Sequence, residues 1–291
     1  MALLVCIWGL EYIFAKQALE TFSPLSLVFF KYLVGFFVLA AVKLAVDRRI
    51  AIRKRELPAL ALCALFGDLI YYYCEYQSLE YIPVALVTII LSLVPLLSMI
   101  IEGVAFNRRP NLPMILGALA CMAGVALVIG VDVGELRGDS GKAIGCALAG
   151  AAVVAWNIYN FLTERLSERY SSLDLTIYQL VCTLLMLVPY ILANMPAAED
   201  FTAGAVGGTL YLGVFGAAIG FFIYVKSISV LGATPCALYS NFLPVSAAAF
   251  GWIFLGETLS ALQILGGAVV IASACMVIAQ KNRLTSRANA G

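Results

Sequence analysis

Five charged residues lie inside long apolar stretches, and their side chains are the first candidates for chemistry: Glu11, Lys31, Asp68, Glu75 and Glu102. An ionised side chain at the centre of a bilayer costs about 2.5–3.5 kcal/mol on insertion scales, so such residues are rare and commonly functional. From this set we expect ion pairing, cation binding or proton exchange. Glu102 comes shortly before Arg108 and Arg109, which favours an interfacial ion pair for that residue.

The spacing of three residues places two carboxyl groups and a phenol on one stripe of a helix. Asp68, Tyr72 and Glu75 stand at i, i+4 and i+7, and side chains with this spacing share a helix face. Either Glu11 or Glu75 could pair with Lys31. The carboxyl groups would then line a water-accessible cavity that binds a substrate amine or exchanges protons with it. The alternative is a buried ion pair that only fixes the packing of the helices.

Aromatic and amide side chains form a second candidate set: Trp8, Trp156, Asn160, Gln179 and Asn241. Such side chains suit a solute that is part apolar and part polar. Trp8, Tyr72 or Trp156 could also make a cation–π contact with an ammonium group. The alternatives are interfacial anchoring for the aromatic residues and interhelical hydrogen bonding for Asn160 and Asn241.

Metal chemistry and covalent catalysis are not indicated. The sequence has no histidine, and its 8 cysteines lie in apolar runs without a CxxC pair, where cysteine behaves as a small hydrophobe. Neither a phosphate-binding loop nor a GxSxG nucleophile motif is present. The sequence therefore predicts no metal site, no cofactor and no enzyme.

The elements that must position these residues are membrane-spanning helices. Hydrophobic residues make up 63% of the chain and charged residues 12%, against about 45–50% and about 25% in soluble domains. Ten windows are apolar over the length of about 20 residues that a bilayer requires: 2–20, 25–46, 57–79, 83–105, 112–130, 142–163, 173–193, 204–226, 234–255 and 261–280. The predicted fold class is an all-α polytopic membrane protein with ten transmembrane helices.

The basic residues predict the orientation of these helices. Fourteen of the 18 lysines and arginines fall on the side that carries the N-terminus, and cytoplasmic loops are enriched in such residues. Because ten spans bring both termini to one side, both termini are predicted to be cytoplasmic.

The sequence also repeats itself after a shift of 149 residues. The shift superimposes Phe66-Gly67 on Phe215-Gly216, Pro95 on Pro244, and Ile115-Leu116-Gly117 on Ile264-Leu265-Gly266; the first helices align one residue earlier, with Trp8 on Trp156. Each half holds five predicted spans, and an odd number inverts the second half in the membrane. Inverted repeats are typical of secondary transporters that bind substrate near the membrane midplane. Pro95 and Pro244 are predicted hinges, because proline frees a backbone carbonyl and permits a kink.

These residues resemble a known family, the EamA-type ten-helix exporters of bacteria, in the drug/metabolite transporter superfamily. The resemblance rests on Ile7-Trp8-Gly9 with Lys16, Ser23-Pro24-Leu25 with Lys31, Ser78-Leu79, Pro95-Leu96, Pro244, and Leu255-Gly256-Glu257 with Gly266. It implies two EamA-type five-helix repeats, at residues 1–132 and 141–281, and a cytoplasmic tail at 282–291. It also implies location in the bacterial inner membrane and export without ATP.

The predicted function is secondary transport that exports small cationic or zwitterionic metabolites, such as amino acids, amines or drug-like solutes, by alternating access. A channel-like facilitator and a non-transporting scaffold subunit are the alternatives. The expected partners are a small-molecule substrate and the lipid bilayer, but no nucleic acid. Proton coupling and a homodimer are left open.

Overall fold

The computed structural model describes residues 1–46, 53–82, 84–105, 111–129, 140–246, 249–250 and 260–288. Regular structure in these residues is helical, without strands. Seven helical stretches are long and apolar enough to cross a membrane: Ala2–Leu19, Pro24–Val46, Lys54–Ser78, Leu86–Val104, Gly141–Ser167, Ser172–Ala193 and Ala203–Leu231. Two shorter apolar helices cover Leu112–Val128 and Ala261–Val277. The all-α polytopic fold is thereby confirmed, while the predicted span 234–255 lies partly outside the described residues.

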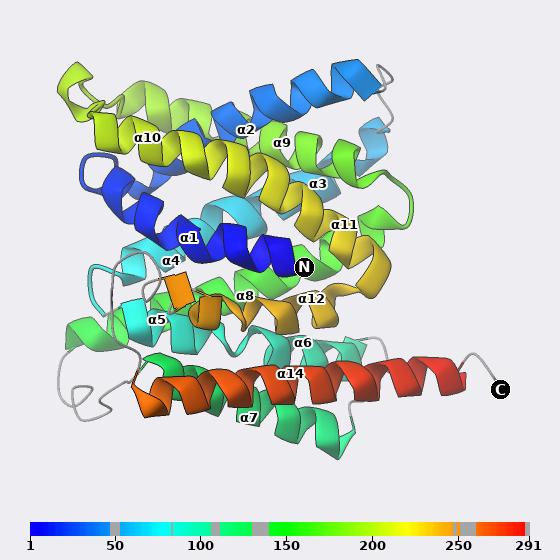
Figure 1. Ribbon diagram of the computed structural model, residues 1–291. Coiled ribbons are helices and arrows are strands. Elements are labelled where there is room, and N and C mark those ends of the chain that lie inside the picture. The colour runs from blue at the N-terminus through cyan, green and yellow to red at the C-terminus, as the bar shows by residue number, and fades with distance from the viewer. Residues whose placement is uncertain are drawn as a thin grey trace. The chain divides into compact units, whose positions relative to one another are not determined.

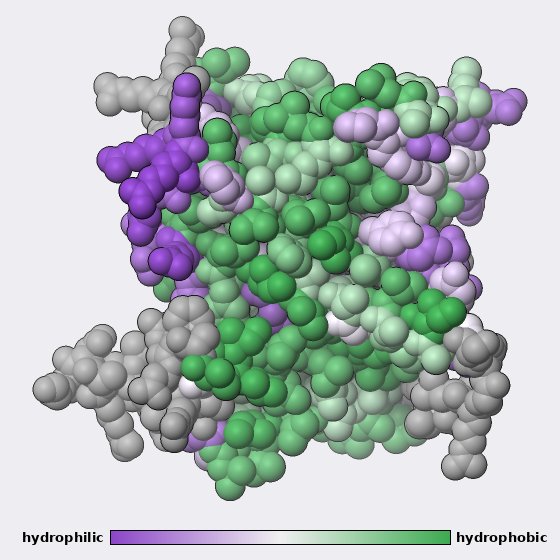
Figure 2. Space-filling view, turned by 180° about the vertical axis from the view of Figure 1, so that it is seen from behind, coloured by the Kyte–Doolittle hydropathy of each residue, from purple (hydrophilic) through white to green (hydrophobic). Residues whose placement is uncertain are grey.

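The surface fits a lipid environment. Large apolar side chains such as Phe37, Leu185 and Val104 are exposed over 64%, 67% and 85% of their area. Figure 2 shows hydrophobic side chains across most of the visible face, with hydrophilic ones gathered toward its left and right margins.

The chain forms two compact units, and each combines segments from both sequence halves. Unit 1 is Met1–Gln77 with Ile158–Gly232, and unit 2 is Ser78–Asn157 with Ala233–Gly291. Unit 1 contains α1 (Ala2–Leu19), α2 (Pro24–Val46), α3 (Leu57–Cys63), η2 (Ala64–Ile70), α4 (Tyr71–Ser78), α9 (Ser172–Ala193), α10 (Ala203–Tyr211), η5 (Leu212–Gly220) and α11 (Phe221–Leu231). Unit 2 contains α5 (Val84–Leu91), α6 (Val94–Ala105), α7 (Leu112–Ile129), α12 (Ala233–Ser240) and α14 (Ala261–Ala288). α8 (Ser140–Ser167) contributes residues to both.

In unit 1, two long helices of the first half pack on helices of the second half. α2 contacts α9 and η5, and α1 contacts α10 and η5, an arrangement that can be followed in Figure 1. Glycines permit the close approach. A Cβ atom on Gly35 would lie 2.9 Å from the Cβ atom of Ala217, and one on Gly208 would lie 2.6 Å from the carbonyl oxygen of Phe14.

Two segments of unit 1 are π-helical, and they stand at corresponding positions of the repeat. η2 covers Ala64–Ile70 and η5 covers Leu212–Gly220; the shift of 149 residues carries 64–70 onto 213–219. Each π segment interrupts a longer helix, since η2 joins α3 to α4 and η5 joins α10 to α11. π segments inside α-helices are rare and often mark functional sites. Asp68 lies within the first one.

In unit 2, the repeat-related helices α7 and α14 pack antiparallel. Gly124 faces the backbone of Gly266, whereas Gly117, which precedes Gly124, faces the later residue Val277. At the centre of the contact, Cys121 Sγ lies 3.9 Å from the carbonyl oxygen of Val270, 149 residues away. Residues at corresponding positions of the two sequence halves therefore contact each other across this antiparallel helix pair.

The two predicted hinge prolines follow breaks in their helices. α5 ends at Leu91 and α6 begins at Val94, so Pro95 is the second residue after a turn. Pro244 is likewise the second residue of the helical stretch 243–246, which follows a turn at 241–242. The hinge role stays a prediction. α14 continues to Ala288, so the helix extends into the segment predicted as a tail.

Candidate functional site

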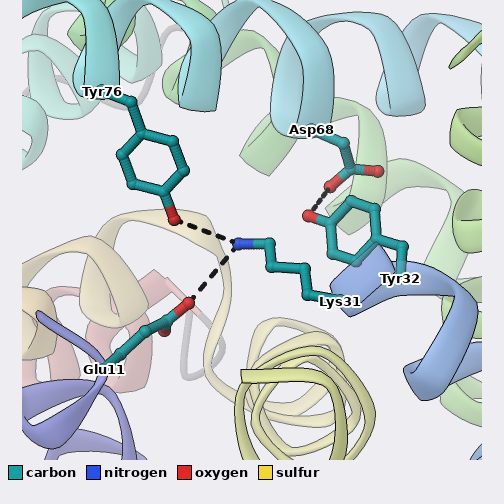
Figure 3. Close-up of polar contacts among 5 residues, drawn as sticks. All are labelled: Glu11, Lys31, Tyr32, Asp68 and Tyr76. Atoms are coloured by element: carbon teal, nitrogen blue, oxygen red, sulfur yellow. Dashed lines mark hydrogen bonds and ion pairs between the residues drawn. The ribbon is translucent and has the colours of Figure 1, made fainter. Parts of the chain in front are cut away.

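A buried ion pair marks the candidate site inside unit 1. Lys31 Nζ on α2 lies 3.4 Å from Glu11 Oε1 on α1 and donates a hydrogen bond of 3.4 Å to the hydroxyl of Tyr76 on α4. The lysine side chain is 1% exposed and the glutamate 13%. Figure 3 shows the ammonium between the two oxygen atoms. Of the two predicted partners, Glu11 makes the direct pair, while Glu75, which is 4% exposed, also attracts the ammonium electrostatically.

Aromatic rings surround the same ammonium group. Lys31 Nζ lies 3.3 Å from the centroid of the Tyr72 ring, 5.2 Å from that of Tyr32 and 5.7 Å from that of Tyr76. The Tyr32 and Tyr72 rings meet edge to face, with centroids 6.3 Å apart. Ring faces attract cations through their quadrupole, so this arrangement stabilises a positive charge without a second full ion pair.

Asp68 accepts hydrogen bonds on both carboxyl oxygens. Tyr32 donates from its hydroxyl at 2.7 Å, as drawn in Figure 3, and Thr183 on α9 donates at 2.6 Å. Asp68 is 1% exposed. The Thr183 hydroxyl also lies 3.0 Å from the backbone carbonyl of Gln179. Because a hydroxyl has one hydrogen, Thr183 can donate to either acceptor. A protonated Asp68 could then donate to Thr183, which would turn to the carbonyl.

The second half supplies a neutral counterpart of the ion pair. The repeat aligns Glu11 with Tyr159 and Lys31 with Gln179. The Tyr159 hydroxyl donates to Gln179 Oε1 at 3.4 Å, across the same separation of 20 residues that joins Lys31 to Glu11. Gln179 Nε2 in turn donates to Thr163 Oγ1 at 3.1 Å. The first half thus contributes the charged groups and the second half contributes hydroxyl and amide groups.

An aromatic cluster adjoins these polar groups. The rings of Tyr32, Trp8 and Tyr159 lie 5.9, 5.8 and 6.3 Å from that of Phe221 on α11. Trp8 also contacts Tyr224, whose hydroxyl donates to Asn160 Oδ1 at 3.0 Å. Asn160 Nδ2 is buried and has no hydrogen-bond partner among the described residues.

The structure gathers most of the predicted site residues in unit 1, which contains Trp8, Glu11, Lys31, Asp68, Tyr72, Glu75, Asn160 and Gln179. Trp156, Asn241 and the two hinge prolines belong to unit 2. Asn241 Nδ2 there donates to the carbonyl of Ser92, its repeat counterpart, at 3.3 Å. That contact joins the turn after α12 to the turn between α5 and α6. Trp156 is buried, at 4% exposure. Arg108 and Arg109, the predicted partners of Glu102, lie outside the described residues.

Several contributing residues were missed from the sequence. Tyr32 and Tyr76 lie next to predicted site residues in the chain, which was the available signal. Thr183 and Phe221 carried none, because a threonine or phenylalanine in an apolar helix is ordinary core or lipid-facing sequence. The predicted stripe assumed α-helical spacing, but Asp68 lies in π-helical η2, whereas Tyr72 and Glu75 lie in α4.

The fold and the site define a multi-pass membrane protein with a charged, buried interior cluster. The EamA-like transporter family model matches the chain twice, over residues 1–130 and 143–279. The chain belongs to that family, within the drug/metabolite transporter superfamily, and is a transporter.

Three similar proteins are named as an exporter, an efflux pump and a transporter. A probable terminal-alkyne amino-acid exporter of Streptantibioticus cattleyicolor is 26% identical over 77% of this chain and 74% of its own length. A probable amino-acid metabolite efflux pump of Salmonella typhimurium is 23% identical over 93% and 90%. An uncharacterized transporter of Bacillus subtilis is 23% identical over 95% and 90%. One solved crystal structure matches with a TM-score of 0.80 at 18% identity, covering 97% of this chain and 96% of the other, which shows a shared fold.

Proposed function

We propose that this protein is a secondary transporter that exports small cationic or zwitterionic metabolites, among them amino acids and amines, by alternating access. The bacterial inner membrane is its proposed location, with both termini in the cytoplasm. The observation that carries the proposal is the charge balance of the cluster in unit 1. Asp68 and Glu75 are buried at 1% and 4% exposure, and Glu11 pairs with the single ammonium group of Lys31.

One ammonium compensates only one carboxylate. An ionised group that is buried without compensation is strongly disfavoured. Asp68, whose two hydrogen-bond donors are neutral hydroxyl groups, is therefore expected to be protonated or to interact with a further cation. Among the described residues, Lys31 is the only lysine or arginine in the buried set. With respect to the part of the chain that the structure describes, the site therefore suits a further positively charged group, either a substrate ammonium or a proton. A phosphate-bearing solute would instead meet carboxyl groups that carry the same negative charge as the phosphate.

A zwitterionic solute also needs donors for its carboxylate. Asn160 Nδ2 is one candidate, since it is buried and unengaged within the described part of the chain. The aromatic cluster around Phe221 would accept an apolar side chain of the solute. Two of the relatives are named for amino-acid export or amino-acid metabolite efflux, which agrees with this choice of substrate class.

The hydrogen bonds of Asp68 support a proposal of proton coupling. Both of its protonation states can be accommodated by turning one hydroxyl, that of Thr183, between Asp68 Oδ2 and the Gln179 carbonyl. The carboxyl group can thus gain or lose a proton without breaking its contact with α9. This makes Asp68 the proposed proton carrier in an exchange of substrate for protons.

The test is a panel of labelled solutes in proteoliposomes, with and without a pH gradient. We expect saturable efflux of amines or amino acids, counterflow, and no flux of sugar phosphates. Flux without saturation or counterflow would indicate a channel. Absence of flux for every solute would support the scaffold alternative and contradict the proposal.

A further inference from the structure

The surroundings of the Lys31 ammonium have the composition of a ligand site. Nζ lies 3.3 Å from the Tyr72 ring centroid, 5.2 and 5.7 Å from those of Tyr32 and Tyr76, and 3.4 Å from the Glu11 carboxylate. Aromatic faces combined with a carboxylate are how proteins recognise ammonium groups of ligands. We call these four residues, Glu11, Tyr32, Tyr72 and Tyr76, the ammonium cage.

The contacts of Lys31 within the cage are long. Both polar contacts, to Glu11 and to Tyr76, measure 3.4 Å, whereas charge-assisted hydrogen bonds are typically about 2.7–2.9 Å. Elsewhere in unit 1, Lys43 Nζ lies 2.7 Å from Asp174 Oδ1. The polar contacts between the cage and the lysine ammonium are therefore longer than the strongest hydrogen bonds. Such contacts suit an ammonium group that can be replaced by another one.

We infer that the ammonium cage is a binding site for primary or substituted amines, which Lys31 fills as a built-in ligand until a substrate ammonium replaces it. This inference rests on the proposed function, because it assigns the cage to the amine of the transported solute. The flexible four-carbon stem of lysine allows its head group to move. Asp68 and Glu75, which already attract the ammonium, are the carboxyl groups that would receive Lys31 once it is displaced.

The exchange keeps one positive charge in the cage at all times. Lys31 lies on α2, and the backbone carbonyl of Lys31 is close to Gly213 of η5, where a Cβ atom would come within 2.8 Å. The backbone of Lys31 is therefore held in a tightly packed contact between α2 and η5, so the exchange involves the lysine side chain alone.

The first test removes the built-in ligand from the full-length protein. Lys31→Ala deletes three carbons and the ammonium, which n-propylammonium would replace atom for atom. We expect n-propylammonium to raise the thermal unfolding midpoint of K31A in detergent in a saturable manner, with little effect on the wild type. Neutral n-propanol and sodium ions should have no such effect. An equal response of wild type and K31A to n-propylammonium would overturn the inference.

Two further variants locate the binding. In the double variant E11Q/K31A, the apparent affinity for n-propylammonium should fall at least tenfold, because the cage has lost its carboxylate. Gln179→Ala is the matched control, since it deletes the repeat counterpart of Lys31 beside a neutral partner, Tyr159; it should show no saturable response to the amine. A similar response in Q179A, or an unchanged affinity in E11Q/K31A, would contradict a site at the cage.

A second variant serves if K31A does not fold. Lys31→Met fills the stem but leaves the cage without an ammonium. Radiolabelled methylammonium should therefore bind to purified K31M at one site per chain, and with higher affinity than to the wild type, in which Lys31 competes for the cage. Absence of binding would refute the cage. These binding measurements do not depend on flux: amine binding by K31M together with no amine transport by the wild type would retain the cage and reject the proposed function.

Discussion

Thr183 donates a hydrogen bond of 2.6 Å to Asp68 at a position where the other half of the molecule has only close packing. The repeat aligns Thr183 with Gly35 and Asp68 with Ala217. Gly35 and Ala217 are so close that a Cβ atom on the glycine would lie 2.9 Å from the Cβ atom of Ala217. The same helix–helix contact is therefore polar in one copy and apolar in the other. Of the two corresponding contacts, the one with Asp68 therefore contains the ionisable group.

Replacing Asp68 with asparagine should remove pH-gradient dependence from transport while leaving the fold intact. The amide can still accept from Tyr32 and contact Thr183, but it cannot carry a proton at this site. We expect efflux from D68N proteoliposomes to be equal with and without a pH gradient, whereas the wild type responds to it. If D68N retains the wild-type response, Asp68 is not the proton carrier.

Replacing Thr183 with valine should destabilise the protein by about 1–2 kcal/mol. Valine has nearly the same shape as threonine but no hydroxyl group, so the buried carboxyl group of Asp68 loses a hydrogen-bond donor. The matched control is Thr176→Val on the same helix. Thr176 is also buried, but its hydroxyl donates only to the carbonyl of Ser172 within α9. Thermal unfolding in detergent should separate the two variants, and an equal shift for both would mean that the contact with Asp68 adds nothing.

Adding a methyl group at Gly67 should be far more damaging than at its repeat counterpart, Gly216. A Cβ atom at Gly67 would overlap the Tyr159 ring, which is itself fully buried, while one at Gly216 would first meet the Glu11 carboxylate at 3.3 Å. Overpacking a core typically costs about 1–3 kcal/mol. Unfolding midpoints should rank G67A well below G216A.

The control for that pair is Gly150→Ala, where a Cβ atom meets nothing within 4 Å. Alanine is the better helix former, so G150A should match or exceed the stability of the wild type. A loss in G150A as large as that in G67A would argue against the steric explanation.

Two ion pairs at helix ends of unit 1 should differ in their contribution to stability. Lys43 and Asp174 join α2 to α9 at 2.7 Å, with side chains 17% and 6% exposed, whereas Arg169 and Glu56 pair at 3.0 Å with the arginine 58% exposed. Asp174→Asn should cost about 1 kcal/mol, and Glu56→Gln only a few tenths, because exposed pairs are weak. Unfolding of both variants at low and high salt tests this, and equal losses would contradict it.

Much of the fold could be predicted from the sequence because the bilayer imposes simple constraints. Apolar run length located the helices that the structure describes, and the repeat predicted which elements correspond. The antiparallel contact of α7 with α14 follows from an odd number of helices per half. The grouping of segments into two units did not follow, since it depends on which helix faces meet, and those faces are apolar on nearly every side.

The charged part of the site was predictable and the neutral part was not. Lys31 and Glu11 could be recognised because a charge in hydrocarbon requires a partner. Thr183 and Tyr32 could not, because a hydroxyl group is tolerated in a helix without one. The π-helical form of η2 also had no sequence signal, and it changes the phase between Asp68 and the residues of α4 that follow.

That phase has a consequence for the direction in which α4 points its side chains. An α-helix turns about 100° for each residue. A π segment has roughly one residue more per turn than an α-helix. Without η2, Tyr72 and Tyr76 would rotate by about that angle around the helix axis and leave the neighbourhood of α2. The π-helical segment between residues 64 and 70 therefore rotates α4 about its axis, so that Tyr72 and Tyr76 face Lys31 on α2.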